Sequence, residues 1–253
     1  MIGIYFSGTG NTKHCVEAFV KQYDENCVAV SIEDPEILGS ILAHDMIVFG
    51  YPVYFSNAPK IVQDFIVQNS AYFSCKKVFI IATMALFSGD GAGCAARLLE
   101  RCNAEIIGGL HLKMPDCIGD EKILKKSPKE CKVLISRADR KIVSSVQKLK
   151  QGHAAKEGLG FPYHMAGLLG QRMWFYTKTT SYKNKPSINK EACVGCSLCT
   201  KLCPMKNLAL ENGKAFSHGR CTLCYRCFNH CPERALSILG KRVYAQYLFE
   251  NHQ

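Results

Sequence analysis

Two stretches of this chain carry the same spacing of cysteines. Residues 193–204 read CVGCSLCTKLCP, and residues 221–232 read CTLCYRCFNHCP. Each stretch follows the pattern C-x₂-C-x₂-C-x₃-C-P, and the second begins at position 221 where the first begins at 193, an offset of 28 residues. Leu208 and Leu210 recur at the same offset as Leu236 and Ile238. The repeat predicts two copies of one small unit, related by a pseudo-twofold axis.

Cysteines in this arrangement predict two [4Fe–4S] clusters. Three closely spaced cysteines wrap one cluster, while the fourth, before proline, ligates the cluster of the other repeat. Zinc is the competing interpretation, but zinc sites use paired C-x₂-C units with a longer gap between the pairs. We therefore expect two crossed ligand sets, one of Cys193, Cys196, Cys199 and Cys231 and the other of Cys203, Cys221, Cys224 and Cys227.

The remaining composition favours a cytoplasmic protein. The 253 residues include 15 cysteines and 47% apolar residues. The N-terminal sequence has no signal-peptide pattern, and the longest apolar runs are shorter than the roughly 18–20 residues of a membrane span. In a reducing compartment cysteines favour metal binding over disulfides. The other seven show no ligand spacing and are expected to be buried small hydrophobes: Cys15, Cys27, Cys75, Cys94, Cys102, Cys117 and Cys131.

The formal net charge of +11 bears on the choice of partner. Bound clusters would lower this charge but leave it positive, which suits an acidic protein partner. No stripe of Lys and Arg interleaved with aromatic residues is evident, so nucleic acid is not expected as a partner. A membrane partner is not expected either.

Residues 1–150 alternate apolar strand-like runs with helical spacing. This alternation predicts a parallel sheet wrapped by helices on both sides. The expected strands are residues 2–6, 28–32, 45–50, 77–83 and 105–112, and the expected helices are 11–22, 59–68, one ending near 102, and 127–150.

Residues 151–185 interrupt this alternation and form the expected connector to a third segment, residues 186–253. Within the connector, Met165, Leu168, Leu169, Arg172, Met173 and Tyr176 follow helical spacing. We expect a short amphipathic helix that docks the two domains, with a lid as the alternative. His153 and His164 are candidates for a proton relay, although satisfied or exposed histidines are commoner.

The loop after the first strand has the composition of a phosphate-binding turn. It reads Ser7-Gly8-Thr9-Gly10-Asn11-Thr12 and precedes the first helix. Glycines permit a tight turn, and the helix N-terminus offers free N–H groups to an anion. The loop matches neither the Walker A pattern nor G-x-G-x-x-G. Hydroxyl groups in place of a Lys and Mg²⁺ suit a terminal monophosphate ester.

The segment from Tyr5 to Thr12 resembles the flavin mononucleotide (FMN) phosphate loop of flavodoxins, and residues 186–240 resemble bacterial two-cluster ferredoxins. The whole chain resembles the fused flavodoxin-like/ferredoxin-like proteins of anaerobic bacteria and archaea. The resemblance implies a flavodoxin-like doubly wound α/β domain with a five-stranded parallel sheet in the order 2-1-3-4-5, and FMN at the carboxyl ends of its strands. A small α+β two-cluster ferredoxin-like domain would follow.

By the same resemblance two further loops should enclose the flavin ring. The first supplies Pro52, Val53, Tyr54, Phe55 and Asn57, and the second Thr83, Met84, Ala85, Phe87, Gly89 and Gly91. Tyr54 or Phe55, and Phe87, are the candidates for stacking on the ring, with core packing as the alternative. Glycines 89, 91 and 93 would let backbone groups reach the flavin edge, and the single tryptophan, Trp174, lies in the connector.

These parts predict an electron-transfer iron–sulfur flavoprotein. A flavin accepts two electrons and a cluster one, so joining them lets a protein split or collect electron pairs. We expect electrons from a low-potential donor to reach the flavin through the clusters and to reduce a small organic acceptor. The alternative is a pure carrier between protein partners, and a redox sensor is a third hypothesis. No NAD(P)H fingerprint is evident, and the oligomeric state stays open, since a second chain could bring its clusters to the flavin.

Overall fold

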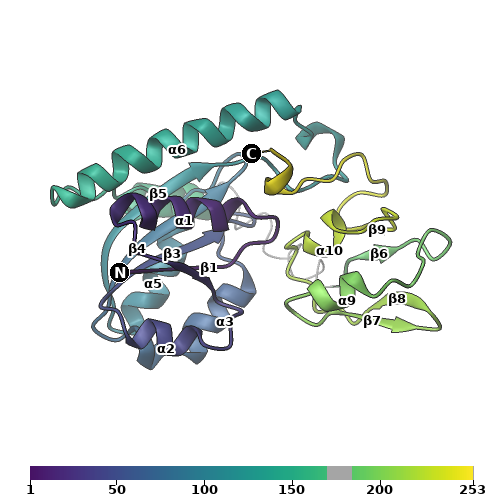
Figure 1. The fold of residues 1–253 in the computed structure, drawn as a ribbon, viewed down its shortest axis with the longest axis horizontal. Coiled ribbons are helices and arrows are strands. Elements are labelled where there is room, and N and C mark those ends of the chain that lie inside the picture. Colours follow the sequence, from purple (N-terminus) through teal and green to yellow (C-terminus); the bar gives the residue numbers. More distant parts are fainter. Residues whose placement is uncertain (170–183, 253) are drawn as a thin grey trace.

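The computed structural model describes residues 1–169 and 184–252, and its N-terminal domain is built on one parallel sheet (Figure 1). The strands lie in the order β2-β1-β3-β4-β5, and each neighbouring pair is parallel. This confirms the predicted strand order. The strands are β1 (Ile2–Tyr5), β2 (Ala29–Ser31), β3 (Met46–Pro52), β4 (Lys77–Met84) and β5 (Glu105–Lys113).

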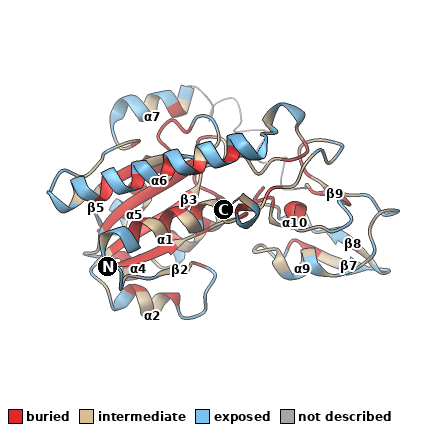
Figure 2. Ribbon diagram, turned by 45° about the horizontal axis from the view of Figure 1, so that its top comes forward, coloured by how far each residue is buried: buried red, intermediate tan, exposed pale blue. Residues whose placement is uncertain are grey.

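Helices cover both faces of the sheet, as the apolar run of β4 requires (Figure 2). On one face Phe79 and Ile81 of β4 join a core with α1 (Asn11–Tyr23) and α6 (Pro128–Lys150). On the other face Val78 and Ile80 join a core with the remaining helices of the domain, α2 (Ile37–Leu42), α3 (Lys60–Gln68), α4 (Ser70–Phe73) and α5 (Gly91–Arg101). Alternate residues of one strand thus serve opposite cores.

Helix starts follow the local sequence. The N-cap of α6 is Ser127, whose hydroxyl accepts from the Glu130 backbone while the Glu130 side chain accepts from Ser127 N–H. The prediction missed α2, which is only six residues long. Gly91 and Gly93, expected in a loop at the flavin edge, lie instead in α5, which begins at Gly91. None of the helices within residues 1–169 and 184–252 is both long and apolar enough to cross a membrane.

The C-terminal domain shows the 28-residue repeat in its backbone. Its helices α9 (Leu198–Leu202) and α10 (Arg226–Asn229) begin at equivalent positions of the two repeats. The same holds for β7 (Leu208–Glu211) and β9 (Leu236–Ser237). Two antiparallel pairs complete the domain, β9 with β6 (Ser187–Ile188) and β7 with β8 (Lys214–Ser217).

The last described residues return to the N-terminal domain. The N–H groups of Tyr244 and Ala245 donate to the Gly119 carbonyl, and Phe249 in the short 3-10 helix η3 (Phe249–His252) joins the core of α1 and α6. A second short turn, η1 (Lys122–Leu124), precedes α6. The segment 186–253 expected as one ferredoxin-like unit therefore contributes its end to the first domain.

The connector contains α7 (Phe161–Gly167), which lies against α5. Met165 of the predicted amphipathic helix lies in α7, while Leu168 and Leu169 follow its end. Arg172, Met173, Trp174 and Tyr176 lie outside the described residues.

Candidate functional site

The eight cysteines of the two repeats gather into two groups, and membership is crossed between the repeats. One cavity is lined by Cys193, Cys196, Cys199 and Cys231, and a second by Cys203, Cys221, Cys224 and Cys227. We call these the first and the second cysteine site. The fourth cysteine of each repeat thus lies in the site of the other repeat, as the expected ligand sets require.

The thiols of each site are close enough to affect one another. Burial raises the pKa of Cys199, and the neighbouring thiols Cys231, Cys193 and Cys196 raise it further. At the second site burial raises the pKa of Cys221 to about 11 and that of Cys224 to about 12. Thiols with such pKa values become thiolates only when a positive group such as an iron centre offsets the charge.

The backbone around these cysteines is shaped for sulfur. Left-handed residues recur at the repeat offset: Gly195 with Leu223, Ser197 with Tyr225, and Lys206 with Arg234. The strain at the five non-glycine positions is typical of a functional loop. N–H groups consequently turn toward sulfur: Leu223 donates to Cys221 Sγ at 3.3 Å, Asn207 to Cys203 Sγ at 3.2 Å, and Ala235 to Cys231 Sγ at 3.4 Å. Such bonds stabilise cluster-bound thiolates, so both sites fit [4Fe–4S] clusters.

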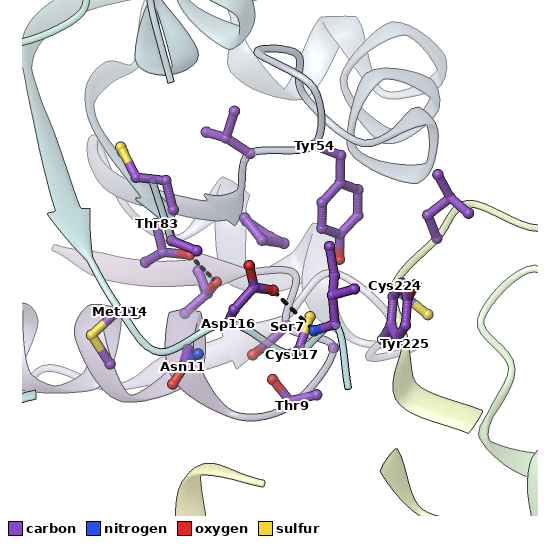
Figure 3. Close-up of a pocket in the computed structure, with 18 of the residues that line it drawn as sticks. Ser7, Thr9, Asn11, Tyr54, Thr83, Met114, Asp116, Cys117, Cys224 and Tyr225 are labelled. Carbon is purple, nitrogen blue, oxygen red and sulfur yellow. Dashed lines mark hydrogen bonds between the residues drawn. The ribbon is translucent and has the colours of Figure 1, made fainter. Parts of the chain in front are cut away.

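A pocket lies at the carboxyl ends of β1, β3, β4 and β5, where the two domains meet (Figure 3). Twelve of the residues expected at the flavin line it: Ser7, Gly8, Thr9, Asn11, Thr12, Pro52, Val53, Tyr54, Phe55, Thr83, Met84 and Ala85. Gly10, Asn57, Phe87, Gly89 and Gly91 are not among its lining residues.

The loop after β1 forms one end of the pocket. Gly10 has φ +98° and no side chain to cap α1, so the first-turn N–H groups stay open to an anion. Its own N–H donates to Ser7 Oγ at 3.1 Å. The buried Thr12 hydroxyl lies 2.7 Å from that of Thr83, which ties this loop to the end of β4. The Asn11 side-chain amide donates to the Pro115 carbonyl at 2.9 Å, which ties this loop to the segment after β5.

The turn after β3 separates the two stacking candidates. Tyr54 and Asn57 exchange two backbone hydrogen bonds of 3.0 Å, and Phe55 and Ser56 between them are left-handed. Phe55 packs on the core of the C-terminal domain as well as lining the pocket. Tyr54 points into the pocket (Figure 3), where burial, with Cys117 and Cys224 adding to it, raises the pKa of its hydroxyl well above the usual value.

The loop after β4 turns away from the pocket. Gly89 lies directly against Gly167 at the end of α7, in space that a side chain would need. Asp90 is fully buried and pairs with Arg97 at 2.7 Å and with His164 at 2.9 Å. His164, a candidate proton relay, therefore faces Asp90. Phe87 is 48% exposed.

Two walls of the pocket had no signal in the sequence. The loop after β5 supplies Met114, Pro115, Asp116, Cys117 and Ile118, and the C-terminal domain supplies Leu223, Cys224, Tyr225 and Leu239. Neither segment has a periodic pattern or motif that points toward the flavin loop. Cys117, expected as a packing residue, thus belongs to the pocket. Burial raises the pKa of the Asp116 carboxyl, although the Ile118 N–H donates to its Oδ1 at 2.9 Å.

Comparison with known proteins assigns each domain separately. Residues 2–102 match the family model described as "Flavodoxin domain", and residues 178–236 match the one described as "4Fe-4S dicluster domain". An archaeal flavodoxin structure is 15% identical, with a TM-score of 0.43, over 59% of this chain and 97% of that chain. The flavodoxin of Megasphaera elsdenii is 27% identical, with a TM-score of 0.40, over 55% of this chain and 99% of that one.

Two curated relatives each match part of the chain. Pyruvate synthase subunit PorD of Thermotoga maritima is 34% identical over 56 residues, which cover 21% of this chain and 57% of the relative. NADH-quinone oxidoreductase subunit I 2 of Geobacter metallireducens is 33% identical over 78 residues, which cover 26% of this chain and 60% of the relative. The chain spans less than two thirds of the length of either relative.

Proposed function

We propose that this chain, an electron-transfer protein that joins a flavodoxin domain to a 4Fe-4S dicluster domain, passes electrons between its two [4Fe–4S] clusters and FMN and reduces a small organic acceptor at the flavin. One observation carries the proposal. Cys224, a member of the second cysteine site, also lines the pocket formed by the loop after β1. A cluster and a flavin held by these residues would be neighbours.

The pocket residues fit FMN. The N-terminus of α1 with the Ser7 and Thr9 hydroxyls would hold the phosphate, since a helix start and hydroxyl donors suit a monophosphate. Tyr54 would cover the ring. At the cysteine sites, the four thiols of each cavity would ligate one cluster.

When bound, a flavin accepts electrons singly or as a hydride, while each cluster carries one. The chain supplies the surroundings for this chemistry. Leu223 and Tyr225 close the pocket from the C-terminal domain and exclude water. Asp116 contributes a carboxyl group to the pocket wall, and burial raises the pKa of this carboxyl.

The order of the sites gives electrons a direction of approach. Cys224 and Cys227 of the second site are buried, whereas Cys196 of the first site is exposed beside Val194, which is 63% exposed. The two sites adjoin, because Cys199 of the first contributes to the raised pKa of Cys227 after burial and the thiols of the second site. A low-potential donor protein would thus reach the first site, and the net charge of +11 favours an acidic one.

A pure carrier is the second candidate. It is favoured by the wall of C-terminal residues over the pocket, because this wall restricts the room for a small substrate beside a flavin. A carrier would show salt-sensitive transfer between protein partners and no turnover of small acceptors.

The test begins with protein purified without oxygen. We expect about eight irons, eight acid-labile sulfides and one FMN per chain, the content of two cubane clusters and one flavin. Full iron without FMN, even after reconstitution, would overturn the proposal. A panel of enones, quinones and nitro compounds with reduced ferredoxin then decides between the candidates: turnover above that of free FMN supports the reductase, and its absence supports the carrier.

A further inference from the structure

We propose that Arg226 is a positioning residue that links the loop after β1 to the second cysteine site, so that FMN affinity and occupancy of that site depend on each other. This inference rests on the proposed function. Arg226 lies between Cys224 and Cys227 in the sequence, and it starts α10. It is one of the residues through which the C-terminal wall of the pocket is attached to the loop after β1.

Its guanidinium group joins segments that are far apart in the sequence. Nη2 donates to the Ser7 carbonyl at 2.7 Å and to Glu33 Oε2 at 2.6 Å. Nη1 donates to Glu33 Oε1 at 2.9 Å and to the Leu202 carbonyl, at the end of α9, at 3.2 Å. The pair with Glu33 is bidentate, the strongest geometry for such a contact.

The burial of Arg226 strengthens these hydrogen bonds. Its side chain is only 16% exposed, and its guanidinium carbon lies 5.7 Å from the centre of the Phe6 ring. Hydrogen bonds to charged groups in such a site contribute more than neutral ones. Phe6 and Ser7 lead directly into the predicted phosphate loop, so this loop is fixed by a side chain of the cysteine domain.

A backbone contact next to Arg226 also links the loop after β1 to the second cysteine site. The Cys224 carbonyl lies directly against Gly8. A change in the loop that carries Cys224 and Arg226 must therefore displace Ser7 and Gly8. Two sites that share one packed unit are energetically coupled, and such coupling is reciprocal: a group that orders the unit helps the second group to bind by the same factor.

Charge adds a second consequence. Arg226 places a positive charge near Cys224 of the second site, where it favours the more negative, reduced state of a cluster. Its removal should lower the midpoint potential of that cluster. A residue that merely supported the fold would leave this potential unchanged.

The experiment compares Arg226→Met with Arg220→Met in the full holoprotein. Arg220 is exposed and precedes Cys221, so its replacement removes one charge from the same domain and leaves the hydrogen bonds of Arg226 in place. FMN affinity is measured by quenching of flavin fluorescence, and cluster potential by spin-resonance titration. Arg226→Met should weaken FMN binding about tenfold and lower the second-site potential, whereas Arg220→Met, whose exposed charge is screened by solvent, should leave FMN affinity unchanged and lower the potential less. Wild-type affinity and potential in iron-replete Arg226→Met would overturn the proposal.

Two further measurements cover other outcomes. If Arg226→Met does not retain its iron, the same measurement is made on Glu33→Gln, which leaves Arg226 in place and removes only its ion pair. Weaker FMN binding by Glu33→Gln supports the proposed role of Arg226, and unchanged affinity overturns it. Wild-type protein stripped of its clusters by chelation should bind FMN about tenfold more weakly than holoprotein. Equal FMN affinity of the cluster-free protein and the holoprotein would refute the coupling between the two sites but not the proposed function. Absence of FMN binding by the holoprotein would refute the proposed function itself.

Discussion

The Cys224 carbonyl oxygen lies against Gly8, in the space that any side chain at position 8 would occupy. Gly8 belongs to the loop after β1, and Cys224 to the second cysteine site. The close approach of a candidate flavin loop and a candidate cluster loop therefore depends on a missing side chain.

Replacing Gly8 with alanine should force the two loops apart. Because the obstacle is backbone, we expect a loss of about 1–3 kcal/mol in the free energy of unfolding, together with weaker FMN binding. Urea unfolding and flavin titration measure both. Gly39→Ala is the matched control: Gly39 is exposed in α2 with no atom near its added Cβ, so this change should stabilise by about 0.5–1 kcal/mol. Equal effects of the two substitutions would contradict the packing argument.

Crossed membership of the cysteine sites predicts the effect of single ligand changes. Cys203→Ser should alter the cluster held by Cys221, Cys224 and Cys227, although Cys203 belongs to the other repeat. Cys231→Ser should alter the cluster of the first site. Spin-resonance spectra of the reduced variants distinguish the two clusters. A spectrum in which Cys203→Ser perturbs the cluster of its own repeat would show that the ligation is not crossed.

Two aromatic side chains that the sequence offers as stacking candidates should differ in their effect on FMN. Tyr54 points into the pocket, so Tyr54→Ala should weaken binding by about tenfold, the loss of one aromatic contact with its buried area. Phe87 is half-exposed outside the pocket, and Phe87→Ala should change the affinity less than about twofold. Flavin titration of both variants checks this, and a larger loss for Phe87→Ala would reverse the assignment.

Stability should depend on pH through His111. Burial lowers the pKa of His111 to about 4, although Glu157 acts in the opposite direction. Its ring lies 3.0 Å from Ser88 Oγ and accepts from the Ala92 N–H at 3.3 Å. Since an unfolded histidine titrates near 6.5, protonation favours unfolding, and this stability is present above pH 6.5 and is lost as the pH falls toward 4.

The corresponding measurement compares wild type with His111→Gln by urea unfolding at pH 7 and pH 5. Wild type should lose roughly 2 kcal/mol more than the variant over this interval, from the shift between about 6.5 and 4. Parallel losses in the two proteins would mean that His111 does not titrate in this way.

Much of this architecture could be predicted from sequence, because it depends on regular spacing. The run from Lys77 to Thr83 is buried on both faces of the sheet. Such an apolar run predicts a central strand from its own sequence alone, without knowledge of the strands beside it. The cysteine repeat likewise predicted which thiols lie together, because the x₃-C-P spacing places the fourth cysteine beyond its own site.

Other features depend on contacts between distant segments and leave no local pattern. Gly8 belongs to the tight turn expected after the first strand, but no pattern indicated that a carbonyl of the other domain would lie against it. Asp120 is buried and accepts from the Tyr225 hydroxyl and from the N–H groups of Ile238, Leu239 and Gly240. A lone aspartate in an irregular loop gives no sign of such partners before the chain is folded. The loop from Met114 to Ile118 lines the pocket for the same reason.

The return of the last described residues has a consequence for biosynthesis. Phe249 donates its N–H to the Thr9 carbonyl and completes the core of α1 and α6, and the Tyr247 hydroxyl donates to Asn11. These partners lie near opposite ends of the described chain. Nearly all of it must therefore be translated before the loop after β1 can form its hydrogen bonds with Tyr247 and Phe249. The N-terminal domain can begin to fold early, but it reaches its finished form only after the cysteine domain has emerged.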